Sequence, residues 1–317
     1  MTEKISTKHL VDPDLQPLLE QLPSFELNVE SLAQVRSISW RVSDQLPVTA
    51  VEKIIEGPDG PLSLLWFDPS PGVSNRAVLL DIHGGGMVFG SAHDMQETPS
   101  LLAHQLGIPV ATINYRLAPE TPFPGPQEDC FAALQWLSEN AKQLGIDPQR
   151  IGVTGQSAGG GLAAAVAQMA RDRGGPAIRC QILVYPMLDH RSGSEADIWK
   201  NRHTGEFVWS RDSNQFGWEA LRGDYEPTDA RKGWFSPSLA EDLSGLPPAW
   251  IGVGTLDLFF DENLDYARRL TDAGIPVELH AYSGAFHGFN IATSARQTVD
   301  FERDMLASTA RLLNLHA

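Results

Sequence analysis

The pentapeptide Gly155–Gly159, with the sequence GQSAG, constrains this 317-residue chain most, because it places a serine between two glycines. A β-branched run at residues 151–154 predicts a buried strand before it, and an alanine-rich run after it predicts a helix. A strand that turns directly into a helix leaves no room for side chains two residues on either side of Ser157. The pattern predicts a nucleophile elbow that holds the serine hydroxyl clear of the backbone. So short a pattern also occurs as ordinary turn chemistry in glycine-rich chains.

Short apolar, β-branched runs alternate with amphipathic helical patterns along most of the chain. Strands are predicted at 77–82, 110–115, 151–154, 180–185, 249–254 and 277–282, with two hairpin-like strands about 57–60 and helices at 128–144, 162–167, 261–273 and 294–313. This alternation predicts an α/β fold, in which helices cover both faces of an open, mostly parallel central sheet.

Two regions interrupt the alternation, and we expect them to form a helical cap. Residues 1–45 carry leucines at 10, 15, 18, 19 and 22, which predict an amphipathic helix. Residues 187–245 lie between two predicted core strands and hold half of the chain's eight tryptophans, at 199, 209, 218 and 234. The remaining residues, 46–186 and 246–317, would form the catalytic domain. The aromatic residues of 187–245 can equally fill a subsidiary core, and the two interpretations are compatible.

Charge, cysteine content and hydropathy limit which binding partners and which cellular compartment are expected for this chain. The 40 acidic and 24 basic residues give a formal charge of −16, which repels phosphate backbones and anionic headgroups, so no nucleic-acid partner is expected. Cys130 and Cys180 fall on a predicted helix and a predicted buried strand, which favours free thiols in a reducing compartment. The first ten residues lack the apolar stretch of a signal peptide, and no run reaches 18 apolar residues. We expect a cytoplasmic protein without stable membrane insertion.

An elbow serine needs a base, an acid that orients the base, and donors for an oxyanion, in the chain order serine, acid, histidine. Asp257 follows the predicted strand at 249–254, and His287 follows the last predicted strand. The predicted triad is therefore Ser157, Asp257 and His287. The sequence HGGG follows the strand at 77–82, and the backbone amides of Gly84, Gly85 and Ala158 are the predicted oxyanion hole.

Several polar residues near the predicted triad and oxyanion hole are expected to have structural rather than catalytic roles. Asp261 and Glu262 lie close to Asp257, but carboxylates are favoured at a helix N-terminus for structural reasons alone. His83 is expected to tie the oxyanion loop by a hydrogen bond, because the donors there must be backbone amides. Two further residues, Arg116 and Glu120, are predicted to form a structural ion pair. No metal or cofactor is expected, because the chain has neither an H-E-x-x-H motif nor paired-cysteine spacing.

These residues together resemble the hormone-sensitive-lipase-like esterases of the α/β-hydrolase superfamily over roughly residues 75–290. The similarity is carried by HGGG at 83–86, YRLAPE at 115–120 followed by PFP at 122–124 and ED at 128–129, the elbow at 155–159, Asp257, and HGF at 287–289. The resemblance implies an α/β-hydrolase fold, a cap built from the N-terminal helices and the segment before the acid, and hydrolysis of short to medium acyl esters. Gln156 departs from the family's common acidic residue, and Gly161 departs from a frequent asparagine.

The expected reaction is serine esterase chemistry on a small-molecule ester. Ser157 attacks the carbonyl, His287 moves the proton and Asp257 fixes the imidazole. A ligand-binding receptor on the same scaffold is an alternative, although related receptors abandon part of the triad. An acyltransferase or amidase using the same triad also stays open, and a homodimer is compatible with the sequence.

Overall fold

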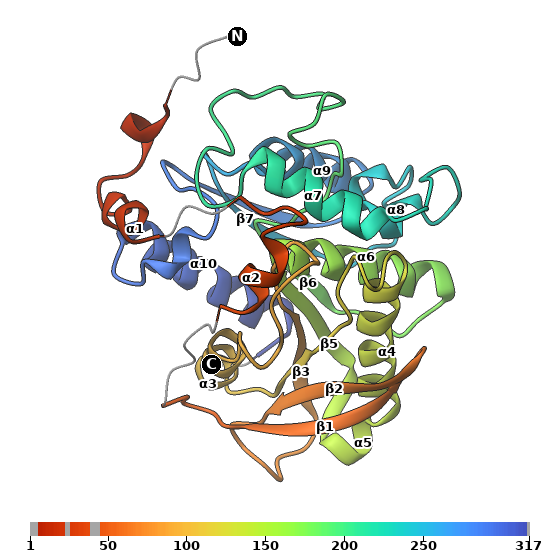
Figure 1. Cartoon of the computed structure of the whole chain (residues 1–317). Helices are drawn as coiled ribbons and strands as arrows, with labels where there is room; N and C mark the ends of the chain where they lie inside the picture. The colour runs from red at the N-terminus through yellow and green to blue at the C-terminus, as the bar shows by residue number, and fades with distance from the viewer. Residues whose placement is uncertain (1–5, 23–25, 39–44, 316–317) are drawn as a thin grey trace.

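The computed structural model describes residues 6–22, 26–38 and 45–315, which build one central sheet with helices on both faces (Figure 1). The strands are β1 (Ala50–Gly57), β2 (Gly60–Phe67), β3 (Arg76–Ile82), β4 (Val110–Ile113), β5 (Ile146–Gln156), β6 (Cys180–Val184), β7 (Ala249–Gly254) and β8 (Val277–Tyr282). Their order in the sheet is β1-β2-β4-β3-β5-β6-β7-β8. β1 and β2 form the antiparallel edge, and the other six strands, β4, β3, β5, β6, β7 and β8, run parallel to one another. The predicted α/β fold is confirmed.

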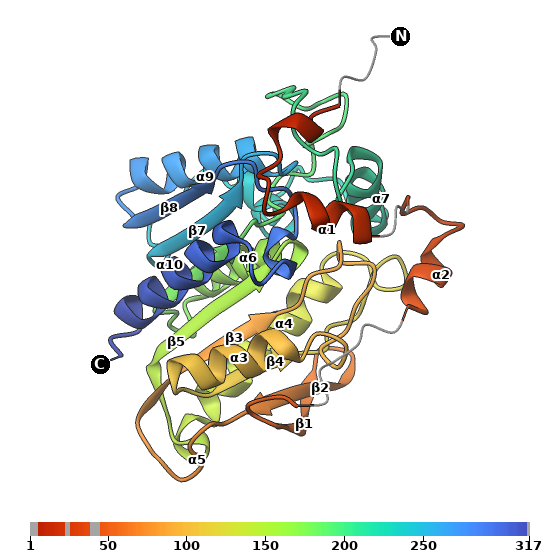
Figure 2. The same cartoon turned by 90° about the vertical axis from the view of Figure 1, so that its left-hand side faces the viewer.

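The helices are η1 (Lys8–Leu10), α1 (Gln16–Gln21), α2 (Leu32–Arg36), α3 (Glu97–Leu106), α4 (Gly125–Glu139), α5 (Ala141–Leu144), α6 (Ala158–Arg173), α7 (Arg211–Arg222), α8 (Lys232–Phe235), η2 (Pro237–Leu239), α9 (Phe260–Asp272), η3 (Phe289–Ile291) and α10 (Arg296–Leu312). α3 and α10 cover one face of the sheet, and α4, α6 and α9 cover the other (Figure 2). Every residue of β3, β4, β6 and β7 is buried. Strands covered on both faces are mostly apolar, which explains the nearly continuous apolar runs in the sequence. The buried polar exceptions are Arg76 and Asp81 in β3, Thr112 in β4 and Gln181 in β6.

The amphipathic helix predicted from the N-terminal leucines is confirmed in part. The six-residue α1 lies between Leu15 and Leu22, whereas Leu10 belongs to η1, and α2 follows further along the chain. Pro17 occupies the first turn of α1, where a missing amide hydrogen costs nothing, and Pro13 cannot continue a helix backwards. Leu15 and Leu18 are nevertheless buried against the α3 side of the sheet. Residues 1–5, 23–25 and 39–44 of this region lie outside the described part of the chain.

Residues 187–245 lie over the edge of the sheet where the parallel strands end, with α7 above the start of α6 (Figure 1). Ser210 caps α7 by accepting a hydrogen bond from the Ser213 amide. Trp218 packs against Phe235 with ring centroids 5.4 Å apart, inside the main core. Trp209 instead lines a cavity. The aromatic residues of this segment therefore divide between core and cavity, as the two compatible interpretations allow.

The expected ion pair between Arg116 and Glu120 is also wrong. Arg116 binds Asp129 with an N–O distance of 2.7 Å and reaches Asp59, whereas Glu120 pairs with Arg36 at 2.7 Å. Residues 114–117 are irregular, so a spacing of four does not bring side chains together as it would on a helix. α3 was not predicted from the sequence, and the helix predicted at 128–144 is divided into α4 and α5.

Candidate active site

The strand-to-helix turn between β5 and α6 consists of Ser157 alone, with φ +58° and ψ −121°. A non-glycine residue rarely adopts this conformation, and the surrounding structure must enforce it. A Cβ atom on Gly159 would stand 1.9 Å from the carbonyl oxygen of Ile82, and one on Gly155 would stand 2.4 Å from the backbone of Gly159. Both glycines are therefore required by close backbone approach. The structure thus has the predicted turn from strand to helix at Ser157.

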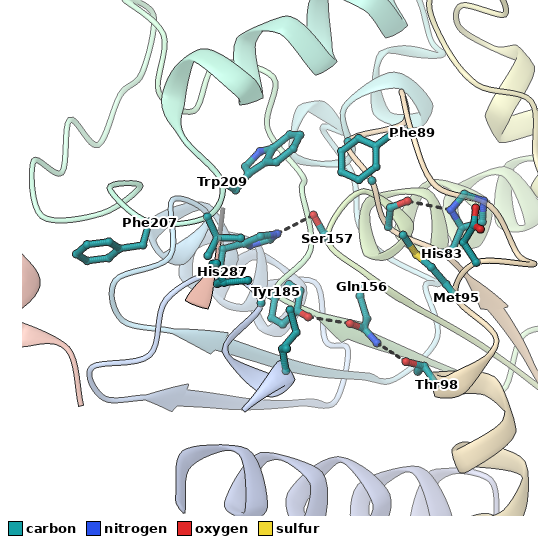
Figure 3. Close-up of a pocket in the computed structure, with 18 of the residues that line it drawn as sticks. His83, Phe89, Met95, Thr98, Gln156, Ser157, Tyr185, Phe207, Trp209 and His287 are labelled. Atoms are coloured by element: carbon teal, nitrogen blue, oxygen red, sulfur yellow. Dashed lines mark hydrogen bonds between the residues drawn. The ribbon is translucent and has the colours of Figure 1, made fainter. Parts of the chain in front are cut away.

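The structure brings Ser157, His287 and Asp257 into one hydrogen-bonded line. His287 Nε2 lies 2.9 Å from Ser157 Oγ (Figure 3). On the other side of the ring, Nδ1 lies 2.8 Å from Asp257 Oδ2. The loop after β7 supplies Asp257, and the loop between β8 and η3 supplies His287. Asp257 is fully buried, and its Oδ1 accepts the Phe259 amide at 2.9 Å. A buried carboxylate at Nδ1 favours the tautomer in which Nε2 accepts the serine proton.

The neighbouring acids contact other groups. Asp261 accepts a hydrogen bond from Asn201 at 2.9 Å. Glu262 accepts hydrogen bonds from the Leu188 amide and from the Ser192 hydroxyl. Burial raises the pKa of Glu262 well above its usual range. Neither carboxylate touches His287, so their roles are structural, as the sequence reasoning expected.

His83 and the neighbouring Tyr115 hydrogen bond to the backbone of the HGGG loop. His83 Nδ1 donates to the Gly84 carbonyl at 2.9 Å, and the imidazole stacks on Tyr115 with ring centroids 4.1 Å apart. The Tyr115 hydroxyl donates to the His83 carbonyl at 3.0 Å. Burial lowers the pKa of His83 to about 4, so this ring is neutral at pH 7. His83 has the structural role that the sequence predicted.

The three amides predicted to bind an oxyanion lie around the serine turn. Gly84 faces the elbow, since a Cβ placed on it would lie 3.6 Å from the Ser157 Cβ. Gly85 has φ +106°, and a Cβ there would stand 2.0 Å from the Phe89 carbonyl oxygen, so only glycine fits. Within the described residues, the amides of Gly84, Gly85 and Ala158 donate no hydrogen bond. These donors are left for a ligand.

A cavity of about 690 Å³ opens over the elbow. Phe89 and Trp209 lie on one side of Ser157, and Tyr185, Gln156 and Thr98 lie on the other (Figure 3). Its lining is mostly apolar, as in sites for small organic ligands. Both irregular regions of the chain contribute to the wall. These residues are Leu19, Leu22 and Ile38 from the first region and Phe207, Val208 and Trp209 from the second.

Gln156 belongs to a polar network that the sequence reasoning missed. The Tyr185 hydroxyl donates to Gln156 Oε1 at 2.8 Å, and Gln156 Nε2 donates to Thr98 at 3.3 Å (Figure 3). Tyr185 also packs edge-on against the His287 ring, with centroids 4.7 Å apart. No local pattern marks these residues, because they come from separate elements. Glycine at 161 is required here, since a Cβ would stand 2.1 Å from the Met187 carbonyl oxygen.

The other sequence expectations concern metals, membranes and thiols. No group of three or more histidine, cysteine, aspartate or glutamate side chains in the described residues could hold a metal ion. Across the same described ranges, no helix combines the length and apolar character needed to span a membrane. Cys130 and Cys180 are both buried free thiols.

Comparison with known proteins gives the class. Residues 79–291 match the family model described as the alpha/beta hydrolase fold. Esterase LipI of Mycobacterium tuberculosis is 34% identical over 297 residues, which cover 89% of this chain and 88% of LipI. The ethyl acetate hydrolase of Pseudomonas putida is 35% identical over 214 residues, 67% of this chain and 66% of that enzyme. The solved structure of a bacterial heroin esterase superposes with a TM-score of 0.87 at 34% identity, covering 97% of this chain and 99% of that one.

The fold and these matches define an enzyme of the α/β-hydrolase class. Within that class the chain belongs to the hormone-sensitive-lipase-like family and is a carboxylic ester hydrolase. The resemblance carried by the HGGG, YRLAPE and GQSAG motifs is confirmed.

Proposed function

We propose that this carboxylic ester hydrolase works through an acyl-enzyme on Ser157, with His287 as general base and Asp257 as the orienting acid. The observation that carries the proposal is the pair of hydrogen bonds, 2.9 Å and 2.8 Å, that joins the three side chains through the imidazole. Ser157 Oγ attacks the ester carbonyl while Nε2 takes its proton. The imidazolium returns that proton to the leaving alcohol. A water molecule then hydrolyses the acyl-enzyme by the same base catalysis.

The amides of Gly84, Gly85 and Ala158 are proposed to bind the oxyanion of the tetrahedral intermediate. The positive end of the α6 macrodipole also lies at Ala158 and favours negative charge there. In other hydrolases, losing one such donor costs about 3 kcal/mol of transition-state stabilisation. These donors favour the transition state over the planar ester, because the negative charge develops only as the carbonyl is attacked.

The proposed substrates are small-molecule esters with short to medium acyl chains. The cavity has the size of a small-ligand site, and Phe89 and Trp209 restrict it beside Ser157. We further propose that residues 1–45 and 187–245 act as a cap over a catalytic domain formed by 46–186 and 246–317. Support comes from Leu19 and Phe207, which reach the same cavity from the two segments. A cytoplasmic location and a homodimer stay predictions.

The test is Ser157→Ala, assayed on p-nitrophenyl esters from acetate to palmitate and with a fluorophosphonate probe. Turnover of the short esters should fall at least about 10⁴-fold, and labelling should disappear, because the nucleophile is lost. Ser244→Ala is the matched control, since the hydroxyl of that exposed serine hydrogen bonds only Asp242. A Ser157→Ala protein that keeps most of its turnover would remove Ser157 from the mechanism. Highest turnover on palmitate would refute the proposed chain length.

The same hydrogen-bonded line opposes the alternative of a catalytically silent receptor, because a receptor has no use for an activated serine. An amidase or acyltransferase would share the triad. Parallel assays with anilides and with added alcohol acceptors distinguish these two activities from hydrolysis.

A further inference from the structure

Asp81 is a buried carboxylate for which the triad has no use. It lies one residue before the end of β3, is 5% exposed and lines the active-site cavity. Burial raises its pKa to about 7. The Thr112 hydroxyl, beside Asp81 in the β3–β4 pair, lowers that pKa as a hydrogen-bond donor does, but the contact is too long or too bent for a hydrogen bond of normal geometry. Among the described residues, no other side chain and no amide donates a hydrogen bond to Asp81. Buried carboxylates are normally paired, so this one calls for a partner from outside the chain.

Further negative charge gathers in the same cavity. Asp94 and Glu97, from the segment that leads into α3, line it together with Asp81. Asp94 lies close enough to His83 to raise the pKa of that imidazole, but burial prevails and the ring stays neutral. Met95 and Thr98, from the same segment, lie on the opposite side of Ser157 from Phe207 (Figure 3). Asp81, Asp94 and Glu97 thus all line this cavity, and we call these three residues its acidic arm; Asp94 already accepts a hydrogen bond from the Ser91 hydroxyl at 2.5 Å.

Positive charge is sparse around this cavity. Lys8 is the one lysine or arginine among the described lining residues, and its Nζ lies 4.0 Å from Glu20. Lys8 also directly follows Thr7, which hydrogen bonds Glu206, another acid of the lining. In a site of low dielectric constant, such an imbalance attracts cations and repels anions.

We propose that the acidic arm is a subsite for a protonated amine carried by the ester substrate, with Asp81 as its principal acceptor. An ammonium N–H would supply the hydrogen bond that Asp81 lacks and would neutralise its charge. Asp81 pairs in register with Thr154 of β5, and Thr154 lies three residues before Ser157. At the rise of a strand, the Cα atoms of Asp81 and Ser157 are therefore roughly 10 Å apart. The amine would therefore lie several bonds from the reacting carbonyl. This inference rests on the proposed esterase function.

Two pairs of esters test the subsite, each matching a tertiary amine with its uncharged carbon isostere. In the first pair the amine is on the acyl side: p-nitrophenyl 6-(dimethylamino)hexanoate and p-nitrophenyl 7-methyloctanoate. In the second it is on the leaving-group side: S-[2-(dimethylamino)ethyl] thioacetate and S-(3-methylbutyl) thioacetate. The measured quantity is the ratio of kcat/KM for the cationic ester to that for its isostere. This ratio cancels general effects on the triad.

The wild-type ratio should exceed one in at least one pair, and Asp81→Asn should lower that ratio by about tenfold or more, the range for hydrogen bonds to charged groups. Glu97→Gln, at an exposed position, should lower it by a smaller factor and serves if Asp81→Asn does not fold. Glu139→Gln is the control, because it removes one negative charge from the exposed end of α4 without touching the cavity. Its ratio should equal that of the wild type.

A ratio near or below one in both pairs would overturn the subsite, as would a ratio unchanged by both Asp81→Asn and Glu97→Gln. These outcomes differ from failure of the esterase mechanism. In that case neither the charged nor the uncharged esters would depend on Ser157. Hydrolysis of all four esters without charge preference would leave the triad in place and remove only the amine subsite.

Discussion

Replacement of Asp81 by asparagine should stabilise the protein, and the gain should depend on pH. Burial raises the pKa of Asp81 from 3.8 to about 7. Between these two values the folded protein binds a proton that the unfolded chain has released, so the contribution of Asp81 to stability falls as pH rises. Below about pH 4 the carboxyl is neutral in both states. Above pH 7 the folded protein holds an ionised carboxylate that has no donor. Asparagine has nearly the same shape and never ionises.

The size of the effect follows from the difference of about 3 pKa units, which corresponds to an upper limit of about 4 kcal/mol. Equilibrium urea unfolding at pH 5, 6.5 and 8 measures it. At pH 8 the free energy of unfolding of Asp81→Asn should exceed that of the wild type by a few kcal/mol. At pH 5 the difference should shrink to about two fifths of that value, because most of the titration lies above this pH.

A difference that stays constant from pH 5 to pH 8 would refute this reasoning, since a change in packing alone carries no protons. A destabilised variant at pH 8 would refute it as well and would mean that Asp81 has a partner in the folded protein. Glu139→Gln, measured in parallel, controls for the loss of one charge. Stability gained together with a loss of amine preference would identify Asp81 as a residue kept for binding at the expense of folding.

Two further predictions concern the framework of the site. Gly159→Ala should lower the melting temperature by more than about 10 °C, because the new Cβ meets the Ile82 carbonyl oxygen at 1.9 Å and neither backbone can move away. Differential scanning calorimetry measures this change. A melting temperature within 2 °C of wild type would contradict the backbone contact. Asp129→Asn should cost about 3 kcal/mol in urea unfolding, because this fully buried carboxylate binds Arg116 through both oxygens. Asp59→Asn removes the exposed partner of the same arginine and should cost less than about 1 kcal/mol; equal losses for the two variants would show that burial does not decide the strength of this pair.

Much of the fold could be predicted from the sequence, because buried parallel strands require nearly continuous apolar runs and such runs are local. The strands predicted at 77–82, 180–185, 249–254 and 277–282 match β3, β6, β7 and β8 to within a residue or two, although β8, at the edge of the sheet, is only partly buried. α3 was missed because its ten residues include a proline near the start and lack a strong apolar stripe. The N-terminal leucines predicted a longer helix than the structure has: Leu15, Leu18, Leu19 and Leu22 pack as one face of the short α1, whereas Leu10 lies on η1 and is exposed.

The candidate triad could also be predicted, because the order serine, aspartate, histidine and the position of each residue after a strand are properties of the chain. The partners of the ion pairs, in contrast, could not be predicted from the sequence. Arg116 and Glu120 lie four residues apart, but their partners, Asp129 and Arg36, come from other parts of the chain. Spacing predicts a contact only where the backbone is regular, and the segment around Arg116 is not.

The sequence by itself determined the elements that depend on neighbouring residues: the strands, the glycines of the elbow and the chain order of the three triad side chains. The tertiary structure alone decided whether those side chains meet, since the 2.9 Å and 2.8 Å contacts of His287 depend on the packing of β5, β7 and β8 in one sheet. It alone also decided that Asp81 is buried in the wall of the cavity that Ser157 lines, with no donor in normal hydrogen-bond geometry. The sequence around an aspartate in a strand does not reveal whether its carboxylate is paired, solvated or without a partner. Its pKa and its interactions are set by residues that are distant in the chain.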